Sequence, residues 1–507
     1  MCGCKGIGRR QAMKSMMAGT ALAGLAPWCL AGCAVNPATG QSSFTGFMSP
    51  DDEKRVGTEQ FPVLVKEFGG EYRDSRLNSY LTSLGNELVK HSETPDAKFT
   101  FAILNSDIVN AFALPGGYVC VSRGLMALCQ DEAELAGVVG HEIGHVVARH
   151  SAQRYSQGMA TNIGLIAAGL GLSVLGAGQA GQSLMNVAQY GAQAFLQSYS
   201  REHEMEADQL GLRYLSRSGY EPVAMVNFLE SLRKHSILQA RMAGQSEGNV
   251  DHFDMMATHP LTKDRIQAAQ QGIGPARAQN ARFDRKAYLD AINGMLFGDD
   301  PEQGMLKGRS FLHPSMRFGF DVPKGFRVSN MPSKVVASNP QGAAIIFDGA
   351  KPRGSGSMAA FLTREWAVRS QVTSVETINL NGMEAATGLT QGNTQGGQPV
   401  AIRLLAIRFQ PDLVFRFMFL APRNQAHAFD EAFRSTTYSF RRLSAEEAAK
   451  VKPLRLIVVE ARAGDTPEKL GATMPFEDYN PDWFKLLNDI DPGQPLKSGQ
   501  TIKVVAG

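Results

Sequence analysis

The chain has 507 residues, enough for about three domains of ordinary size, and its composition is that of a globular protein with abundant glycine. Its formal net charge is only +3, and no block of like charge interrupts the sequence. We therefore expect no nucleic-acid partner.

Residues 1–33 have the features of a targeting segment. Several basic residues precede an uncharged, mostly small or apolar stretch that ends in Leu30-Ala31-Gly32-Cys33. This ending resembles a bacterial lipobox, which implies cleavage before Cys33 and a lipid on that cysteine. Arg9-Arg10 also resembles a twin-arginine export signal, and a plain transmembrane anchor is the alternative. Because Ala34 and not aspartate follows Cys33, we expect the periplasmic face of the outer membrane rather than the inner membrane.

The segment that follows predicts helices and then strands. Ser49-Pro50 and the acidic residues after them are typical of a helix start. Leucines at positions 77, 81, 84 and 88 predict an amphipathic helix. Residues 98–104 read as a strand, and proline and glycine divide residues 110–121 into a strand, a turn and a strand.

The sequence His-Glu-Ile-Gly-His at positions 141–145 is the principal chemical motif. Two histidines four positions apart lie on one face of a helix, close enough to bind one metal ion, and residues 131–140 open with the acidic side chains of a helix start. Imidazole suits zinc, and an adjacent carboxylate can hold a metal-bound water. We hypothesise that His141 and His145 bind Zn²⁺ and that Glu142 is the general base. A chance match on a buried helix is the alternative.

A third ligand is expected on another helix, because a catalytic zinc usually has three protein ligands. Glu204 and Asp208 are four residues apart and share a helix face, so one can bind the metal while the other supports it. The alternative is a solvated acidic face, since Glu202 and Glu206 flank Glu204.

Together the two motifs resemble the zinc metallopeptidases of the CAAX prenyl protease, HtpX and BepA type. The matching residues are His141, Glu142, His145, Ser200, Arg201, Glu204, Ala207 and Asp208. The resemblance implies that Glu204 is the third ligand of a single Zn²⁺ and that Asp208 and Arg201 support the site.

Two further segments match the same family. Residues 258–266 resemble its His-Pro…Arg-Ile segment, which implies that His259 can reach the zinc as a fourth, inhibitory ligand and that Arg265 supports the site. A loop histidine that caps the next helix is the alternative. The strand–turn–strand segment implies a substrate-binding edge strand, since an exposed edge can pair with an extended peptide; an ordinary hairpin is the alternative. The implied residues are Asn110, Ala111, Phe112, Gly116 and Gly117.

Residues 155–200 contain no charged side chain and predict a helical hairpin near the cleft, either a lid or a membrane-facing surface. Their most apolar part, residues 163–175, is shorter than the ~20 residues of a spanning helix. His150 is interpreted as structural or supporting, because Ser151 occupies the place where a metzincin has its third histidine.

The rest of the chain predicts a linker at 283–309, a strand-rich α+β accessory domain at 310–443 and a small βααβ domain at 444–507. The last resembles a LysM module, which implies contact with peptidoglycan, although the insert at 476–483 is unusually long and a stabilising tail is the alternative. The matching residues are Gly464, Asp465, Thr466, Leu470, Leu486, Leu487, Asn488, Leu496, Gly499, Gln500 and Ile502.

The expected fold is therefore α+β, with a mainly helical zincin-type peptidase domain at 34–282 that contains a small sheet. The expected function is that of a membrane-anchored periplasmic zinc metalloendopeptidase, whose protein or peptide substrates are misfolded or unassembled envelope proteins. The alternatives are a non-catalytic cell-wall scaffold and a muropeptide amidase.

Overall fold

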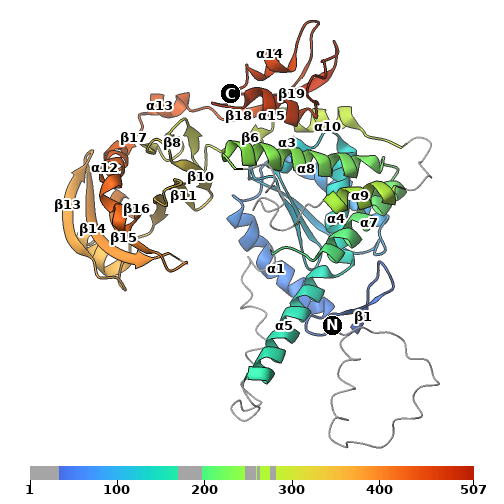
Figure 1. Ribbon diagram of the computed structural model, residues 1–507, viewed down its shortest axis with the longest axis horizontal. Coiled ribbons are helices and arrows are strands. Elements are labelled where there is room, and N and C mark those ends of the chain that lie inside the picture. The colour runs from blue at the N-terminus through green and yellow to red at the C-terminus, as the bar shows by residue number, and fades with distance from the viewer. Residues whose placement is uncertain (1–32, 170–196, 246–258, 260–262, 274–280, 395) are drawn as a thin grey trace, which may run out of the picture.

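The computed structural model describes residues 33–169, 197–245, 259, 263–273, 281–394 and 396–507. Helices and sheets are mixed in the α+β arrangement that the sequence predicts. The seven-stranded sheet with α12 lies to one side, and the helices of residues 50–292, the small sheet and the C-terminal strands lie together (Figure 1). Within the described part of the chain, none of the helices combines the length and the apolar character needed to traverse a bilayer.

The peptidase region is built mainly of helices, and their starts follow the sequence signals. Ser49 forms a capping box with Asp52 at the start of the first helix, as its position before proline predicts. The helix that begins at Val223 extends to Met242, and its later turns bury Leu238 and Ala240. The helices are α1 Pro50–Glu67, α2 Ser75–Lys90, α3 Arg123–Leu128, α4 Glu132–Val147, α5 His150–Gly169, α7 Arg201–Arg217, α8 Val223–Met242, α9 Lys263–Gly272 and α10 Arg285–Ile292.

A three-stranded sheet packs against α4 and contains β3 Thr100–Leu104, β4 Ala111–Leu114 and β5 Tyr118–Ser122. The order is β3-β5-β4, with β3 parallel and β4 antiparallel to β5. Among the described strands, β4 therefore has one free edge. The turn from β4 to β5 uses Gly116 and Gly117 at φ values of +83° and +94°, which favour glycine.

The N-terminal end of the described chain forms a short hairpin of β1 Cys33–Val35 and β2 Ser42–Phe44, and β2 packs beside α5. Helix α5 is the first arm of the hairpin predicted for residues 155–200, and it projects away from the body (Figure 1). The second arm lies largely outside the described residues.

Residues 283–309 are not a linker, which corrects the prediction. Helix α10 buries Tyr288, Leu289 and Ile292 against the peptidase core, and β6 Leu296–Phe297 pairs with a strand of the C-terminal region. The run of Gly, Asp and Pro at 298–304 reads as a connector, but it covers only the end of this segment.

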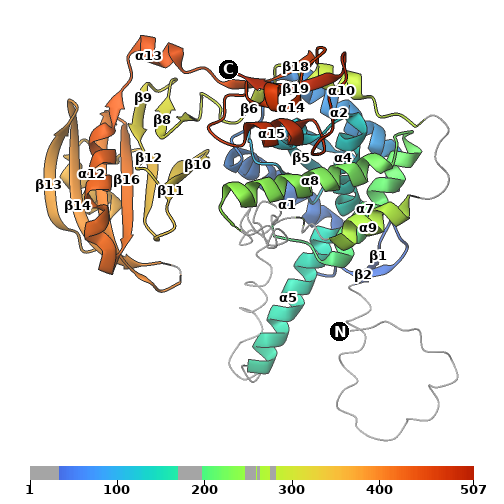
Figure 2. The ribbon, with the colours of Figure 1, turned by 45° about the horizontal axis from the view of Figure 1, so that its top comes forward.

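The C-terminal residues 451–507, here called the tail, have the expected βααβ order: β18 Leu454–Glu460, α14 Pro467–Gly471, α15 Asn480–Leu487 and β19 Thr501–Ala506. Strands β18 and β19 are antiparallel, and β6 extends their sheet. Phe484, Leu487 and Ile502 belong to the same apolar cluster as the zinc-motif helix, so the tail is not a separate domain. It packs beside α3, α8 and α10 (Figure 2).

The accessory domain covers residues 305–443 and so begins slightly before its predicted start. A four-stranded sheet has the order β17-β9-β8-β7, and a seven-stranded antiparallel sheet has the order β10-β11-β12-β16-β15-β14-β13. Helix α12 Asp430–Ser439 covers one face over a phenylalanine-rich core, and α11 Met358–Phe361 covers the other. The strands are β7 Met305–Lys307, β8 Ser310–His313, β9 Phe318–Asp321, β10 Arg327–Met331, β11 Lys334–Ser338, β12 Ala344–Ala350, β13 Thr373–Leu380, β14 Met383–Asn393, β15 Pro399–Gln410, β16 Leu413–Pro422 and β17 Arg441–Arg442.

Candidate metal centre

Helix α4 presents the first two predicted ligands and the predicted base. Asp131 caps the helix by accepting a hydrogen bond from the backbone N–H of Glu134. His141, Glu142 and His145 are all at least 94 % buried, because α4 packs against α2, α7, α8 and β4. The motif therefore lies in the interior of the domain.

Helix α7 brings the predicted third ligand to α4. Ser200 caps α7, which places Glu204 in its first turn. The two helices approach closely at glycines: a Cβ on Gly211 would lie 3.1 Å from the backbone nitrogen of His141. A larger residue there would force α7, and with it Glu204, away from the histidines.

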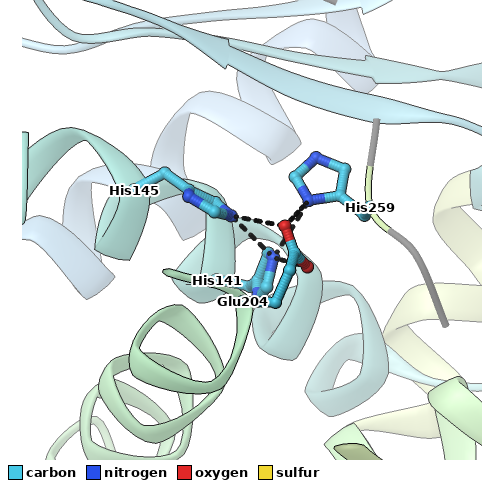
Figure 3. A group of neighbouring side chains, drawn as sticks. All are labelled: His141, His145, Glu204 and His259. Carbon is cyan, nitrogen blue, oxygen red and sulfur yellow. Dashed lines mark hydrogen bonds and ion pairs between the residues drawn. The ribbon is translucent and has the colours of Figure 1, made fainter. Parts of the chain in front are cut away.

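Four side chains converge at this crossing: His141, His145, Glu204 and His259 (Figure 3). One ligand atom from each lies within 4.8 Å of all the others. His141 Nε2 is 3.0 Å from His145 Nε2, and each of these nitrogens is 3.5 Å from a carboxylate oxygen of Glu204. Ligands 2.0–2.1 Å from a tetrahedral Zn²⁺ are about 3.3 Å apart, so the donor types and their spacing fit zinc.

The charges of the site also favour a cation. Burial alone would lower the pKa of His141, but hydrogen bonds to Asp208 and Glu204 outweigh it and raise the pKa to about 10. The carboxylates of Asp208 and Glu204 thus stabilise a positive charge at the ring of His141. Burial lowers the pKa of His145 well below its usual value despite Glu204, which keeps that imidazole neutral, as a ligand must be.

His141 is held from behind by a buried ion pair. Asp208 Oδ1 lies 2.9 Å from His141 Nδ1. Arg265, from α9, donates two hydrogen bonds to Asp208 at 2.7 and 2.8 Å and lies 2.7 Å from Glu204. The structure therefore places Asp208 against His141 and not against Glu204, and Arg265 joins the two carboxylates. An outer carboxylate of this kind orients a metal-binding histidine.

His145 is held by a different chain of side chains. Its Nδ1 is 2.8 Å from Nδ1 of His150, whose Nε2 is 3.3 Å from Glu206. Asn36 donates a 2.6 Å hydrogen bond to Glu206, and Tyr199 stacks on the His145 ring at 4.0 Å between centroids. His150 is fully buried, in keeping with a supporting role.

Sequence reasoning missed three of the side chains that hold His145 in place: Tyr199, Glu206 and Asn36. Glu206 enters the sequence analysis only as a residue that flanks Glu204, and its position two residues after Glu204 gives no sign that it turns toward His150. Tyr199 immediately precedes the cap of α7, where an apolar residue is common, and this is the one available signal.

Residues 75–273 match the profile of Peptidase family M48. This domain belongs to the M48 family of zinc metallopeptidases. The chain is 33 % identical over 218 residues to the Beta-barrel assembly-enhancing protease of Escherichia coli (strain K12), which covers 43 % of each chain. It is 29 % identical over 244 residues to the Mitochondrial metalloendopeptidase OMA1 of Schizosaccharomyces pombe, covering 47 % of this chain and 66 % of that protein. The chain thus spans less than half the length of the bacterial relative it matches.

Within the M48 domain, Glu142 lies beside the ligand cluster and is 2 % exposed. Burial raises its pKa, although His259 and His141 oppose the shift. A carboxylate with a raised pKa is a stronger base than an exposed one, because it holds an accepted proton more tightly. This is the property that the predicted general base requires.

His259 lies directly over the other three ligands. Its Nδ1 is 2.9 Å from Glu204 and 3.3 Å from His141 Nε2, and its Nε2 is 3.3 Å from Glu142. The M48 domain therefore brings His259 to the metal centre, as the resemblance implies.

Of the remaining predicted residues, some line a cavity beside the ligands and others lie away from it. Asn110 and Ala111 line a cavity beside His141 and Glu142. Phe112 packs instead on Phe68, because alternate side chains of β4 face opposite ways. Gly116 and Gly117 lie in the turn, against Lys54 of α1 and Lys98, and not at the ligands. Arg201 is 74 % exposed and pairs with Asp264 at 3.8 Å, so it does not share the buried position of Arg265.

Proposed function

We propose that the chain is a zinc-dependent metalloendopeptidase with one Zn²⁺ held by His141, His145 and Glu204. The observation that carries the proposal is the convergence of these ligands beside the buried Glu142 in an M48 domain. When bound there, zinc supplies a Lewis acid that polarises a carbonyl and acidifies water.

The side chains of the protein then perform the proton transfers. Glu142 accepts a proton from the attacking water as the new C–O bond forms, and returns it to the amine nitrogen as the C–N bond breaks. The free edge of β4 supplies backbone groups that pair with an extended substrate. Arg265 with Asp208, and His150 with Glu206, keep the two histidines in position.

We further propose a periplasmic location with a lipid on Cys33 at the outer membrane. The lipobox-like sequence supports the anchor, and residues 1–32 lie outside the described structure. Misfolded or unassembled envelope proteins are the proposed substrates, and the name of the Escherichia coli relative, Beta-barrel assembly-enhancing protease, supports this choice. Peptidoglycan contact through the tail stays a prediction that rests on its βααβ order.

His259 is proposed as a regulatory fourth ligand. Four protein ligands leave a tetrahedral zinc without a position for water. Replacing His259 by alanine should raise basal self-cleavage while leaving zinc bound, because three ligands remain. If His259 instead stabilises the transition state, the same change lowers turnover. Unchanged activity and unchanged zinc affinity would remove both roles.

The decisive experiment replaces Glu142 by glutamine. Glutamine can hold water but cannot accept its proton, so casein hydrolysis should fall by roughly 100- to 10,000-fold while bound zinc stays at one per chain. Glu202→Gln is the matched control, since Glu202 is exposed on α7. Wild-type turnover in Glu142→Gln would exclude the mechanism. Cleavage of muropeptides without cleavage of casein would support an amidase, and inactivity toward both with zinc bound would support a scaffold.

A further inference from the structure

A cavity of about 60 Å³ opens beside Glu142 and His141. A single water needs roughly 10–15 Å³ measured in this way, so the cavity has room for a larger group. Most of its wall is apolar and comes from α3, α4 and α8. The apolar residues that carry the argument are Leu125, Val138, Met225, Phe228, Leu229 and Leu232.

The charged residues that border this cavity are already paired. Arg265 and Asp208 form the buried ion pair described above. Glu142, His141 and His259 belong to the metal centre, so the cavity opens directly onto the reacting groups. A charged group placed against the apolar wall would lose its hydration without gaining a partner, whereas an apolar group would be stabilised.

A second, smaller cavity lies beside His145. Its volume is about 10 Å³, enough for no more than one water. It is bordered by His145, Tyr199, Ala113 and Pro115, and by the ion pair of Glu53 with Arg149. Strand β4 therefore runs from the large apolar cavity at Asn110 and Ala111 to the small one at Ala113.

The proton transfer decides which half of a substrate meets the large cavity. Hydrolysis breaks the C–N bond, and the nitrogen that receives the proton from Glu142 belongs to the residue on the C-terminal side of that bond. Among the described residues, Glu142 borders the large cavity and not the small one. The residue C-terminal to the cleaved bond must therefore lie at the large cavity.

The direction of β4 leads to the same placement. A peptide that pairs antiparallel to β4, the more stable arrangement, runs from the Pro115 end toward Asn110. Its C-terminal half then lies at the large cavity. Two independent features, the position of Glu142 and the direction of β4, thus give the same orientation of the bound peptide.

We infer that this cavity is the specificity subsite for the side chain immediately C-terminal to the cleaved bond, and that it takes large apolar side chains such as Leu, Ile, Met and Phe. The inference rests on the proposed peptidase function and adds the substrate class.

The first test digests a library of peptides from a bacterial proteome with the purified protein and maps the cleaved bonds by mass spectrometry. Leu, Ile, Met and Phe should be enriched about tenfold or more over Asp, Lys and Gly directly after the cleaved bond. Enrichment of charged residues there, no preference, or an apolar preference only before the bond would overturn the inference.

A pair of variants on α4 ties the preference to the cavity. Val138→Ala enlarges the cavity and should shift the preference toward Phe and Trp by about tenfold relative to Leu. Val139→Ala removes the same two methyl groups from the next residue, which is fully buried but does not border the cavity, and should leave the preference unchanged. Equal preferences in the two variants would also overturn the inference.

A binding measurement separates this inference from the proposed function. Leu-Gly-amide and Asp-Gly-amide mimic products whose free amine lies at Glu142, and calorimetry on the zinc-loaded protein gives their affinities. Binding of the leucine peptide at least tenfold tighter supports the subsite even if no library peptide is cleaved, in which case the peptidase proposal alone fails. Equal affinities would refute the subsite whatever the turnover.

Discussion

The tail and the accessory domain both follow the peptidase helices in the sequence, yet they are joined to them in different ways. The tail places Phe484, Leu487 and Ile502 in the same apolar core as the helix that carries the zinc motif. The accessory domain has apolar clusters of its own, and its contacts with the peptidase region include polar ones, such as the hydrogen bond from Arg327 to the Met242 carbonyl. Position in the chain therefore says little about which segment the peptidase fold requires.

Buried polar contacts make the attachment of the tail specific. The Lys503 ammonium is fully buried and donates to the carbonyls of Ala127, Leu128 and Cys129 at 2.9, 3.4 and 2.7 Å. These carbonyls end α3, and burial lowers the pKa of Lys503 to about 7. Gln130, the next residue, donates to the Leu487 carbonyl at 3.1 Å. The tail thus fixes the segment that leads directly into the cap of α4.

Removing the tail should have the largest effect. A chain that stops after Lys450 exposes several core side chains, each worth about 1.5–3 kcal/mol, against a total stability of about 5–15 kcal/mol. We expect loss of cooperative unfolding by circular dichroism and loss of bound zinc. A soluble, truncated protein with the wild-type melting temperature would show that the tail is an independent module after all.

Lys503→Met should have an intermediate effect. The apolar side chain fills similar space but leaves the three α3 carbonyls without their donor, which should cost about 3 kcal/mol. Urea unfolding followed by fluorescence measures this change. Lys497→Met is the matched control, because Lys497 is exposed in the same tail, and it should stay within about 0.5 kcal/mol of wild type. Similar midpoints for the two variants would contradict a docking role for Lys503.

Replacing residues 305–450 by a short Gly-Ser linker should have the smallest effect. Leu296 and Phe297 of β6 pair with Arg455 and Leu454 of β18, so the points where the accessory domain leaves and rejoins the peptidase region are close together. We expect a melting temperature within about 4 °C of wild type, since little shared core is lost. Zinc content and small-peptide turnover should not change. A large loss of either would place the accessory domain within the peptidase fold, reversing the contrast with the tail.

The sequence predicted the parts of the molecule that depend on local spacing. His141 and His145 lie four residues apart on one helix, and the acidic start of that helix, which begins at Asp131, is also a local signal. The partner of Asp208 could not be predicted, because spacing gives the face of α7 but not that His141 lies opposite. The docking of Lys503 joins residues 376 positions apart, and no local pattern encodes such a contact. Helix α10 was predicted as linker because eight residues are too few for a clear helical period.

The hydrogen-bonded side chains that hold His145 end at Asn36, close in sequence to the proposed lipid on Cys33. Asn36, which holds Glu206, is only three residues from Cys33, a span of roughly 10 Å even when extended. A lipid on Cys33 would therefore act as a very short tether and hold the metal centre beside the bilayer. Such an enzyme would search a thin layer at the membrane surface and not the volume of the periplasm, so polypeptides that linger at that surface would meet it at a much higher local concentration than those that pass by in solution.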